Sequence, residues 1–294
     1  MTPSYVNRVS ATRRTLATTF IVAWLALAIL PFAWTLWGSF KVQQDFFSFA
    51  GWQDALSGPH TQEQTGSAFT LGAYRGVWIE QQFWKPAART LIVSAAVVVI
   101  SLAFGTLGGY ALARSNQRYA FFILIAALVF RAIPGITLIS GYLQPFFRLN
   151  MWGHLWTAVI VLVALNQPFT LWLLHSFFLG VPRALDESAM VDGCTRFQAF
   201  RLTIMPVMWP GVITTGIFSF LGAYNDFVIC QMLLSRQNQT MVPTIAGFLG
   251  TIAQAGRPMY AVAATVIVTL PLFFLVLAFQ SRIVSGLTAG AVKG

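Results

Sequence analysis

Charged side chains are scarce in this chain of 294 residues, because Asp, Glu, Lys and Arg together make up only 9% of it. Soluble domains carry about a quarter of their residues as these four types. Hydrophobic residues make up 57% of the sequence instead. The shortage of charge therefore excludes an ordinary soluble domain and indicates an integral membrane protein, solvated mostly by lipid.

Cysteines and catalytic motifs are also few. Cys194 and Cys230 are the only cysteines, so a framework of several disulfides is excluded. The pattern Gly-x-x-x-x-Gly-Lys-Ser/Thr is absent, so the chain has no phosphate-binding loop of its own, and a partner must handle any ATP. The three histidines are isolated from one another and lack metal-ligand spacing. These absences argue against the alternative of a membrane-embedded enzyme, and we expect no cofactor and no metal site.

Apolar runs long enough to cross a bilayer recur along the chain. A spanning helix needs about 20 mostly apolar residues. The sequence predicts an all-α integral membrane protein with six transmembrane helices, at 16–37, 87–113, 119–142, 155–178, 209–234 and 260–280. The first run follows Arg13 and Arg14, as a signal peptide would. Its core is longer than a usual signal core and no small-x-small cleavage site follows, so we expect an uncleaved anchor.

Basic residues predict the orientation in the membrane. Six spans place most of them in tails and short loops on one side: Arg8, Arg13, Arg14, Arg114, Arg118, Arg183, Arg196, Arg201, Arg282 and Lys293. By the positive-inside rule this side is cytoplasmic and holds both termini. The predicted organisation is a tail 1–15, a first span 16–37, a periplasmic loop 38–86, a core 87–281 and a tail 282–294. The net charge of +10 forms no patch with interleaved aromatics, so we expect no nucleic-acid partner.

The most polar segment of the second half, residues 186–210, is predicted to begin with a short helix. Pro182 suits the first turn of that helix. Asp186 and Glu187 lie early in it, where the helix dipole favours negative charge. Gly193 can end the helix in a left-handed conformation. The segment is therefore expected to be ordered, unlike a random cytosolic loop.

A second helix is expected directly after this glycine corner. Thr195 followed by Gln198 three residues later has the capping-box pattern. Phe197, Phe200 and Ile204 recur at helical spacing and form one apolar stripe. The stripe would face either another protein or the bilayer surface, and both alternatives stay open. The helix is expected to stop or kink at the two prolines that follow, Pro206 and Pro210.

The same segment resembles the EAA loop of bacterial ABC-transporter permeases. Its pattern is Glu-Ala-Ala, three residues, Gly, nine residues and Ile-x-Leu-Pro, and here Glu187, Ala189, Gly193 and Pro206 keep the spacing. The sequence departs from this pattern at Ser188, Thr203 and Met205. The resemblance continues through residues 210–227 and 286–294. It is a resemblance to carbohydrate-uptake permeases related to the second membrane subunit of the maltose transporter.

This resemblance implies a MetI-like type I ABC importer permease architecture in a bacterial inner membrane. It implies a second, different permease subunit in a heterodimer, two copies of an ATP-binding subunit and a periplasmic solute-binding protein. The implied solute is a carbohydrate or polyol. The EAA loop, residues 179–208, would form the coupling element that docks on the ATPase. The residues expected there are Asp186, Glu187, Ser188, Ala189, Asp192, Gly193, Phe197, Phe200 and Pro206.

The end of the sequence, GLTAGAVKG, has two interpretations. Taken alone, it is small and flexible and predicts a frayed tail. In the resembling subunits the corresponding tail reaches into the ATPase dimer interface. The residues that would do so here are Gly286, Leu287, Thr288, Ala289, Gly290 and Lys293.

Two ionisable residues, Arg131 and Asp226, fall inside predicted spans, where each costs about 2.5–3.5 kcal/mol on insertion scales. They could pair with each other, but their depths along the spans, about 18 and 26 Å, differ by nearly the reach of an arginine. We prefer Arg131 beside the break at 133–135, and Asp226 facing a translocation cavity. The candidate cavity residues are Arg131, Tyr224, Asn225 and Asp226.

Small residues four apart in the second predicted span, Gly105, Gly109 and Ala113, predict close helix packing. The alternative to an importer subunit is a non-transporting scaffold or receptor. Such a protein would keep the spans but has no reason to carry the two-helix segment. Co-purification separates the two, since only an importer subunit retains an ATPase in detergent.

Overall fold

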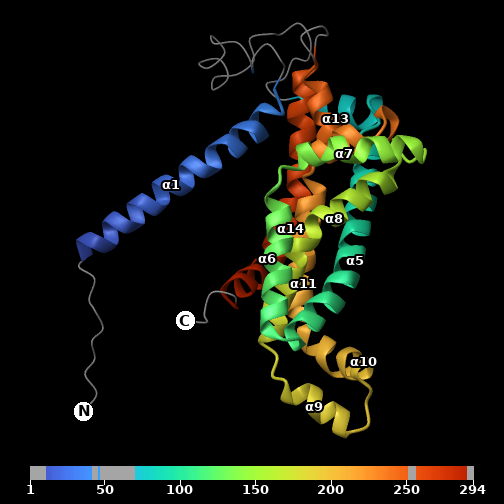
Figure 1. Cartoon of the computed structure of the whole chain (residues 1–294). Coiled ribbons are helices and arrows are strands. Elements are labelled where there is room, and N and C mark those ends of the chain that lie inside the picture. The colour runs from blue at the N-terminus through green and yellow to red at the C-terminus, as the bar shows by residue number, and fades with distance from the viewer. Residues whose placement is uncertain (1–10, 42–45, 47–69, 251–255, 290–294) are drawn as a thin grey trace, which may run out of the picture. The chain divides into compact units, whose positions relative to one another are not determined.

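The protein is described by a computed structural model that covers residues 11–41, 46, 70–250 and 256–289. Every regular element in these ranges is a helix (Figure 1). The chain divides into two units, Met1–Gln81 with Phe248–Thr269, and Gln82–Gly247 with Leu270–Gly294. The prediction of an all-α membrane protein is thus confirmed.

The first unit contains a long apolar helix, α1 (Ala11–Gly38). Its part Arg13–Gly38 is long and apolar enough to cross a membrane, which agrees with the predicted first span. Large apolar side chains from Leu16 to Phe32 are exposed along it. A helix that is apolar on all sides is expected where lipid or another apolar surface surrounds it.

The described part of the predicted loop 38–86 adds short helices to the first unit. They are α4 (Gly72–Arg75) and a π-helical turn, Gly76–Glu80. The Tyr260 hydroxyl, in the first turn of α14 (Pro258–Ala289), donates a hydrogen bond to Glu80 Oε2 at 3.0 Å. A Cβ on Gly76 would meet this tyrosine ring at 2.4–2.8 Å, so the glycine lets the two segments approach. Most of the loop lies outside the described residues.

The second unit is built around three packed helices, α5 (Trp84–Arg114), α8 (Leu155–Leu179) and α11 (Met205–Tyr224). The predicted small residues lie in the contact between α5 and α8. A Cβ on Gly105 would meet Thr170 Cγ2 at 2.6 Å, and one on Gly109 would meet Leu174 Cβ at 3.0 Å. The prediction of close helix packing is therefore confirmed.

The third predicted span, 119–142, is not one straight helix. It is divided into α6 (Gln117–Ala132) and α7 (Gly135–Arg148), which meet at an angle of 88°. The break falls at Ile133 and Pro134. A residue before proline avoids the helical region, and Ile133 is extended, with φ −69° and ψ 126°. The described residues thus contain five single helices that could span a membrane, or six spans if this bent pair is one.

The predicted boundaries of the fifth span, 209 and 234, are wrong. α10 (Arg196–Ala199), a π-helical turn (Phe200–Ile204) and α11 form one run of 29 residues, Arg196–Tyr224. Pro206 does not stop this run, and it lies at the start of α11, directly after the π-helical turn. The chain leaves the helix after Tyr224, and α12 (Val228–Leu233) is a separate short helix.

The remaining helices are α9 (Ala184–Val191), a 3₁₀ turn (Arg236–Asn238), α13 (Met241–Phe248) and α14. Part of α14, Pro258–Ser281, could span a membrane, as predicted for 260–280. The helix continues to Ala289, so residues 286–289 are helical rather than a frayed tail. Gly290 and Lys293 lie outside the described residues.

Candidate functional site

The predicted helix–corner–helix segment is present in the structure. α9 and α10 lie beyond one end of the α5, α8 and α11 bundle (Figure 1). Gly193 joins them with φ +90°, which confirms the predicted left-handed corner. Thr195 and Gln198 form the predicted capping box, with Thr195 N donating to Gln198 Oε1 at 2.8 Å and Gln198 N donating to Thr195 Oγ1 at 3.3 Å. We call residues 179–208 the coupling loop.

The carboxylate of Asp186 faces the interior, not the exposed surface of the coupling loop. Arg114, the last residue of α5, donates from Nε to Asp186 Oδ2 at 2.8 Å, and its Nη2 lies 2.8 Å from the same oxygen. The Tyr110 hydroxyl, one turn earlier in α5, donates to Asp186 Oδ1. The arginine and aspartate side chains are only 16% and 11% exposed. Asp186 therefore anchors α9 to α5.

Arg114 also reaches the end of α8. Its Nη1 donates to the Phe178 carbonyl oxygen and its Nη2 to the Val181 carbonyl oxygen, each at 3.2 Å. The last carbonyl groups of a helix lack intrahelical partners and carry partial negative charge, so a cation stabilises them. One guanidinium thus joins α5, α8 and α9. We call Tyr110, Arg114 and Asp186, with these two carbonyl groups, the Arg114 cluster.

Aromatic rings pack around this cluster. The Tyr110 ring lies 5.6 Å from the Phe178 ring and 4.9 Å from the Phe200 ring, between centroids. Phe200 and Ile204 belong to the buried core with Phe178. The predicted stripe is therefore wrong in part, because two of its three residues point inward and only Phe197 is exposed. Tertiary packing against α5 and α8 fixes the inward face, which helical spacing alone does not show.

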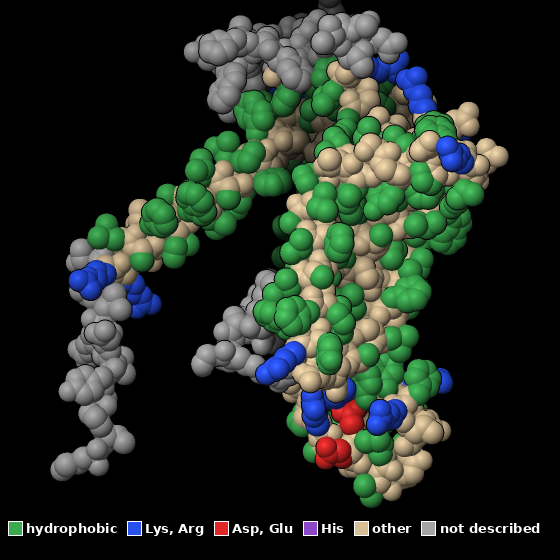
Figure 2. All heavy atoms as spheres, in the orientation of Figure 1, with side chains coloured by type: hydrophobic (Ala, Val, Ile, Leu, Met, Phe, Trp, Pro, Cys, Tyr) green, Lys and Arg blue, Asp and Glu red, His purple; other side chains and the backbone are tan. Residues whose placement is uncertain are grey.

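The outer face of the coupling loop is both acidic and apolar. Glu187, Ser188, Asp192, Gly193 and Pro206 are exposed, whereas Ala189 is buried. Two apolar side chains stand out, with Val191 87% exposed and Phe197 62% exposed. In the face shown in Figure 2, acidic side chains gather at this end of the unit, next to several basic ones. The loop thus offers a free surface on one side and a fixed anchor on the other.

The sequence did not identify Tyr110 and Arg114 as site residues. Arg114 entered the prediction only as one of the basic residues that indicate the membrane orientation. A signal was available. The two residues are four apart, so they share a face of one helix, and they lie at the end of a mostly apolar span.

The four predicted cavity residues have different neighbours. Arg131 donates from Nη1 to the Leu165 carbonyl oxygen at 3.1 Å, and its guanidinium carbon lies 5.5 Å from the centroid of the Phe169 ring. Asp226 lies between α11 and α12, outside any span, and its Oδ1 accepts from Cys230 N at 3.0 Å. Among the described residues these two side chains form no ion pair with each other.

Tyr224 and Asn225 complete the predicted set. Tyr224 is buried, with its ring 5.2 Å from the Phe220 ring, whereas Asn225 is exposed and donates to the Leu221 carbonyl oxygen at 3.0 Å. Burial raises the pKa of the neighbouring Asp226 carboxyl, and the N–H of Cys230 lowers it in part. These contacts hold the end of α11 and leave Asn225 exposed, as Arg131 is in α6.

The sequence is similar to those of known membrane transport proteins. A family model described as binding-protein-dependent transport system inner membrane component matches residues 102–288. The trehalose/maltose transport system permease protein MalG of Thermococcus litoralis is 31% identical over 91% of this chain and 92% of that protein. The sulfoquinovosyl glycerol transport system permease protein SmoH of Agrobacterium fabrum is 30% identical over 94% of this chain and 93% of that protein.

A solved structure shows the same fold. The crystal structure of a bacterial ABC transporter involved in the import of the acidic polysaccharide alginate contains a similar chain, with a TM-score of 0.73 at 18% identity, over 95% of this chain and 99% of that one. The two-helix coupling loop, the spanning helices and the sequence similarity along most of the chain all indicate the same family. The chain belongs to the family of binding-protein-dependent transport system inner membrane components, the membrane permeases of ABC importers.

Proposed function

We propose that this permease takes up a carbohydrate or polyol, such as a sugar, an oligosaccharide, a sugar alcohol or a glycerol-type solute. The observation that carries the proposal is the similarity, along more than nine-tenths of the chain, to permeases named for trehalose and maltose and for sulfoquinovosyl glycerol. The family name supplies the second element, a binding protein that delivers the solute.

The proposed complex contains a second, different permease subunit and two copies of an ATP-binding subunit. The absence of a phosphate-binding loop from the sequence supports the need for a separate ATPase. The proposed location is a bacterial inner membrane, with both termini and the coupling loop on the cytoplasmic side. The density of arginine in tails and short loops supports this orientation.

In the proposed mechanism the outer face of the coupling loop docks on the ATP-binding subunit. Glu187 and Asp192 supply negative charge, and Val191 and Phe197 supply exposed apolar surface. Gly193 supplies the turn between the two helices, and the buried Ala189 and Phe200 pack on the inner side. Ser188 and Pro206 are exposed and belong to the outer face. Exposed apolar side chains beside charged ones are typical of protein interfaces.

The Arg114 cluster would transmit the motion. ATP-driven movement of α9 pulls on Asp186, and the ion pair with Arg114 passes this displacement to the ends of α5 and α8. A loop that was free of the bundle could dock on the ATPase and still leave the spanning helices in place. In this proposal the spanning helices have two arrangements, and ATP binding at the docked partner favours one of them.

Two further parts of the proposal concern regions away from the loop. The end of the chain, from Gly286 through Lys293, would reach the ATP-binding subunits, and the helical course of residues 286–289 gives it a stiff base. The pathway for solute would pass the exposed amide of Asn225, next to Asp226 and Tyr224. Arg131 in α6, which donates a hydrogen bond to a backbone carbonyl of α8, would lie beside this pathway.

The experiment is to reconstitute the chain with its partner subunits and binding protein in liposomes. A panel of sugars and polyols is then tested for stimulated ATP hydrolysis and for accumulation inside. We expect one or a few of them to raise both signals. An ATPase subunit that fails to co-purify, together with no uptake of any solute, would favour the non-transporting scaffold.

A further inference from the structure

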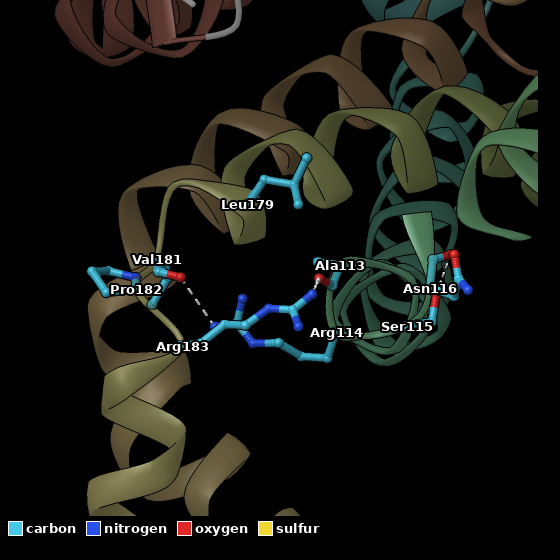
Figure 3. Close-up of a pocket in the computed structure, with 8 residues that line it drawn as sticks. All are labelled: Ala113, Arg114, Ser115, Asn116, Leu179, Val181, Pro182 and Arg183. Atoms are coloured by element: carbon cyan, nitrogen blue, oxygen red, sulfur yellow. Dashed lines mark hydrogen bonds between the residues drawn. The ribbon is translucent and has the colours of Figure 1, made fainter. Parts of the chain in front are cut away.

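Two cavities adjoin at the end of α5. The first has a volume of about 560 Å³ and is lined by Ala113, Arg114, Ser115, Asn116, Leu179, Val181, Pro182 and Arg183 (Figure 3). The second has a volume of about 470 Å³, and its lining includes Leu112, Phe121, Leu124, Leu128, Trp172 and His175. Ala113 and Leu179 line both, so the cavities are neighbours. We call them the basic cavity and the apolar cavity.

The basic cavity carries more positive than negative charge. Figure 3 shows Arg114 and Arg183 extending into it from opposite sides, Arg114 from the end of α5 and Arg183 from the segment before α9. Asp186 pairs with Arg114. The Nη2 of Arg183 makes a long hydrogen bond of 3.4 Å to the Ala113 carbonyl oxygen, and Arg183 forms no ion pair within the described residues. One guanidinium charge is thus left for an anion.

The start of α6 adds a smaller contribution. Ser115 and Asn116 line the basic cavity, and α6 begins at the next residue. The Asn116 side chain caps this end, because its Oδ1 accepts from Arg118 N at 3.0 Å, so that N–H is not available to a ligand. The first turn of this 16-residue helix contains no acidic side chain, so the positive end of the helix dipole still favours an anion beside Arg183.

The apolar cavity lies between spanning helices α5, α6 and α8. Phe121, Leu128 and Trp172, which line it, are 59%, 36% and 42% exposed. Exposed apolar side chains on spanning helices face hydrocarbon chains. A ligand that fills both cavities must therefore carry an anionic group at one end and an apolar chain at the other.

We propose that the paired cavities bind an anionic phospholipid. Its phosphate group occupies the basic cavity beside Arg183, and one acyl chain lies in the apolar cavity against Leu128 and Trp172. Basic pockets between membrane helices on the cytoplasmic side recognise lipid headgroups in this way. The lipid would contact the Arg114 cluster, since Arg114 lines the basic cavity as well. The lipid composition of the membrane would therefore affect the ion pair that anchors the coupling loop.

The test measures lipid retained by the detergent-purified importer complex, by native mass spectrometry, after exchange into dioleoyl phosphatidylglycerol or dioleoyl phosphatidylcholine. Wild type is expected to retain phosphatidylglycerol in preference. Arg183→Gln is expected to weaken this retention roughly fivefold, because one arginine near a headgroup contributes about 1 kcal/mol, and 1.4 kcal/mol is a factor of ten. Arg201→Gln is the matched control, since Arg201 is exposed and does not line either cavity.

A second variant tests the acyl chain independently of charge. Leu128→Trp fills part of the apolar cavity and is expected to reduce phosphatidylglycerol retention while the arginines remain. Equal retention of both lipids by wild type, or unchanged retention in Arg183→Gln, overturns the proposal. Loss of the lipid to excess inorganic phosphate overturns it as well, because it identifies a small-anion site. If Arg183→Gln fails to assemble, Leu128→Trp decides alone, and unchanged phosphatidylglycerol retention in that variant overturns the proposal.

Discussion

The two ends of α8 are held in different ways. At its C-terminal end, a single guanidinium binds the carbonyl oxygen of Phe178 in the last turn, that of Val181 just after the helix, and a buried carboxylate. Just before its first turn, neutral hydrogen bonds are spread over several residues. Gly153 N donates to Leu233 O at 2.9 Å, Asn238 Nδ2 donates to Gly153 O at 2.8 Å, and Trp152 Nε1 donates to Met232 O at 3.2 Å.

This difference concerns how stabilisation is distributed. Removing one partner of a buried ion pair leaves the other charge desolvated, whereas removing one neutral hydrogen bond among several costs about 1 kcal/mol. The coupling-loop end therefore depends on few atoms, and the other end on many. A charge-linked anchor fits the proposed role of this end in transmitting movement.

The largest effect is expected for Asp186→Ala. The change leaves Arg114 without its carboxylate in a site where its side chain is 16% exposed, and breaking such a pair costs about 3–5 kcal/mol. We expect a lower thermal unfolding midpoint of the detergent-purified complex and loss of coupling between ATP hydrolysis and uptake. Glu187→Ala removes the same charge from the exposed face, where it anchors no helix of this chain, and should lower the midpoint far less. Equal midpoints for the two variants would contradict the anchor.

Tyr110→Phe sharpens the comparison by removing one hydroxyl and leaving the ring. The lost hydrogen bond ends on a charged carboxylate, so the expected cost is about 1.5–3 kcal/mol, smaller than for Asp186→Ala. The same unfolding measurement detects it. Tyr142→Phe is the control, because that hydroxyl makes no hydrogen bond to any described residue while its ring packs 6.3 Å from the Phe146 ring. A Tyr110→Phe protein as stable as this control would show that the hydroxyl contributes nothing.

Gly193→Ala tests the corner of the coupling loop without touching the ion pair. An added Cβ would have open space around it, but the backbone φ of +90° is unfavourable for alanine by about 1–2 kcal/mol. We expect uptake to fall more than stability, because the corner sets the angle between α9 and α10. Gly141→Ala, also in open space but inside α7, should be neutral or stabilising. Full uptake by Gly193→Ala would mean that the corner geometry does not matter.

The smallest effect is expected at the other end of the unit, for Asp226→Asn. Burial holds the pKa of this carboxyl above its ordinary value of about 3.9, so the fold favours the protonated form. Stability from this group is present at low pH and is lost as the pH rises through the folded pKa. The neutral amide can still accept from Cys230 N.

At pH 7 the variant should therefore match or slightly exceed wild type in its unfolding midpoint, and this advantage should vanish below about pH 4. The matched comparison is Asp186→Asn, which should be destabilising at pH 7 because its carboxylate is paired with Arg114. A strongly destabilised Asp226→Asn protein would show that this end, too, depends on charge.

Local patterns in the sequence predicted the features that local chemistry controls. The capping box of Thr195 and Gln198, the glycine corner at Gly193 and the close approach at Gly105 and Gly109 all follow from neighbouring residues, and the structure contains them. The long apolar runs likewise predicted which segments are spanning helices, since a run of about 20 apolar residues matches the thickness of the bilayer core.

Long-range contacts account for what the sequence did not predict. The inward direction of Asp186 depends on Arg114, 72 residues earlier, and the inward direction of Phe200 depends on Tyr110. The 88° bend after α6 was expected as a break at 133–135, but its angle depends on the packing of the following helix. The end of α11 at Tyr224 was missed because apolar residues resume at Phe227, directly after the polar pair Asn225 and Asp226.

One measurement tests most directly the claim that the coupling loop receives motion from an ATPase. A photo-crosslinking amino acid is placed at position 187 of the complete importer in proteoliposomes, and the same probe is placed at position 156, where Trp156 is exposed in the first turn of α8. We expect the probe at 187 to capture the ATP-binding subunit, with a yield that changes on ATP binding, and the probe at 156 to miss it. Crosslinks from position 187 to lipid alone, in every nucleotide state, would contradict the account.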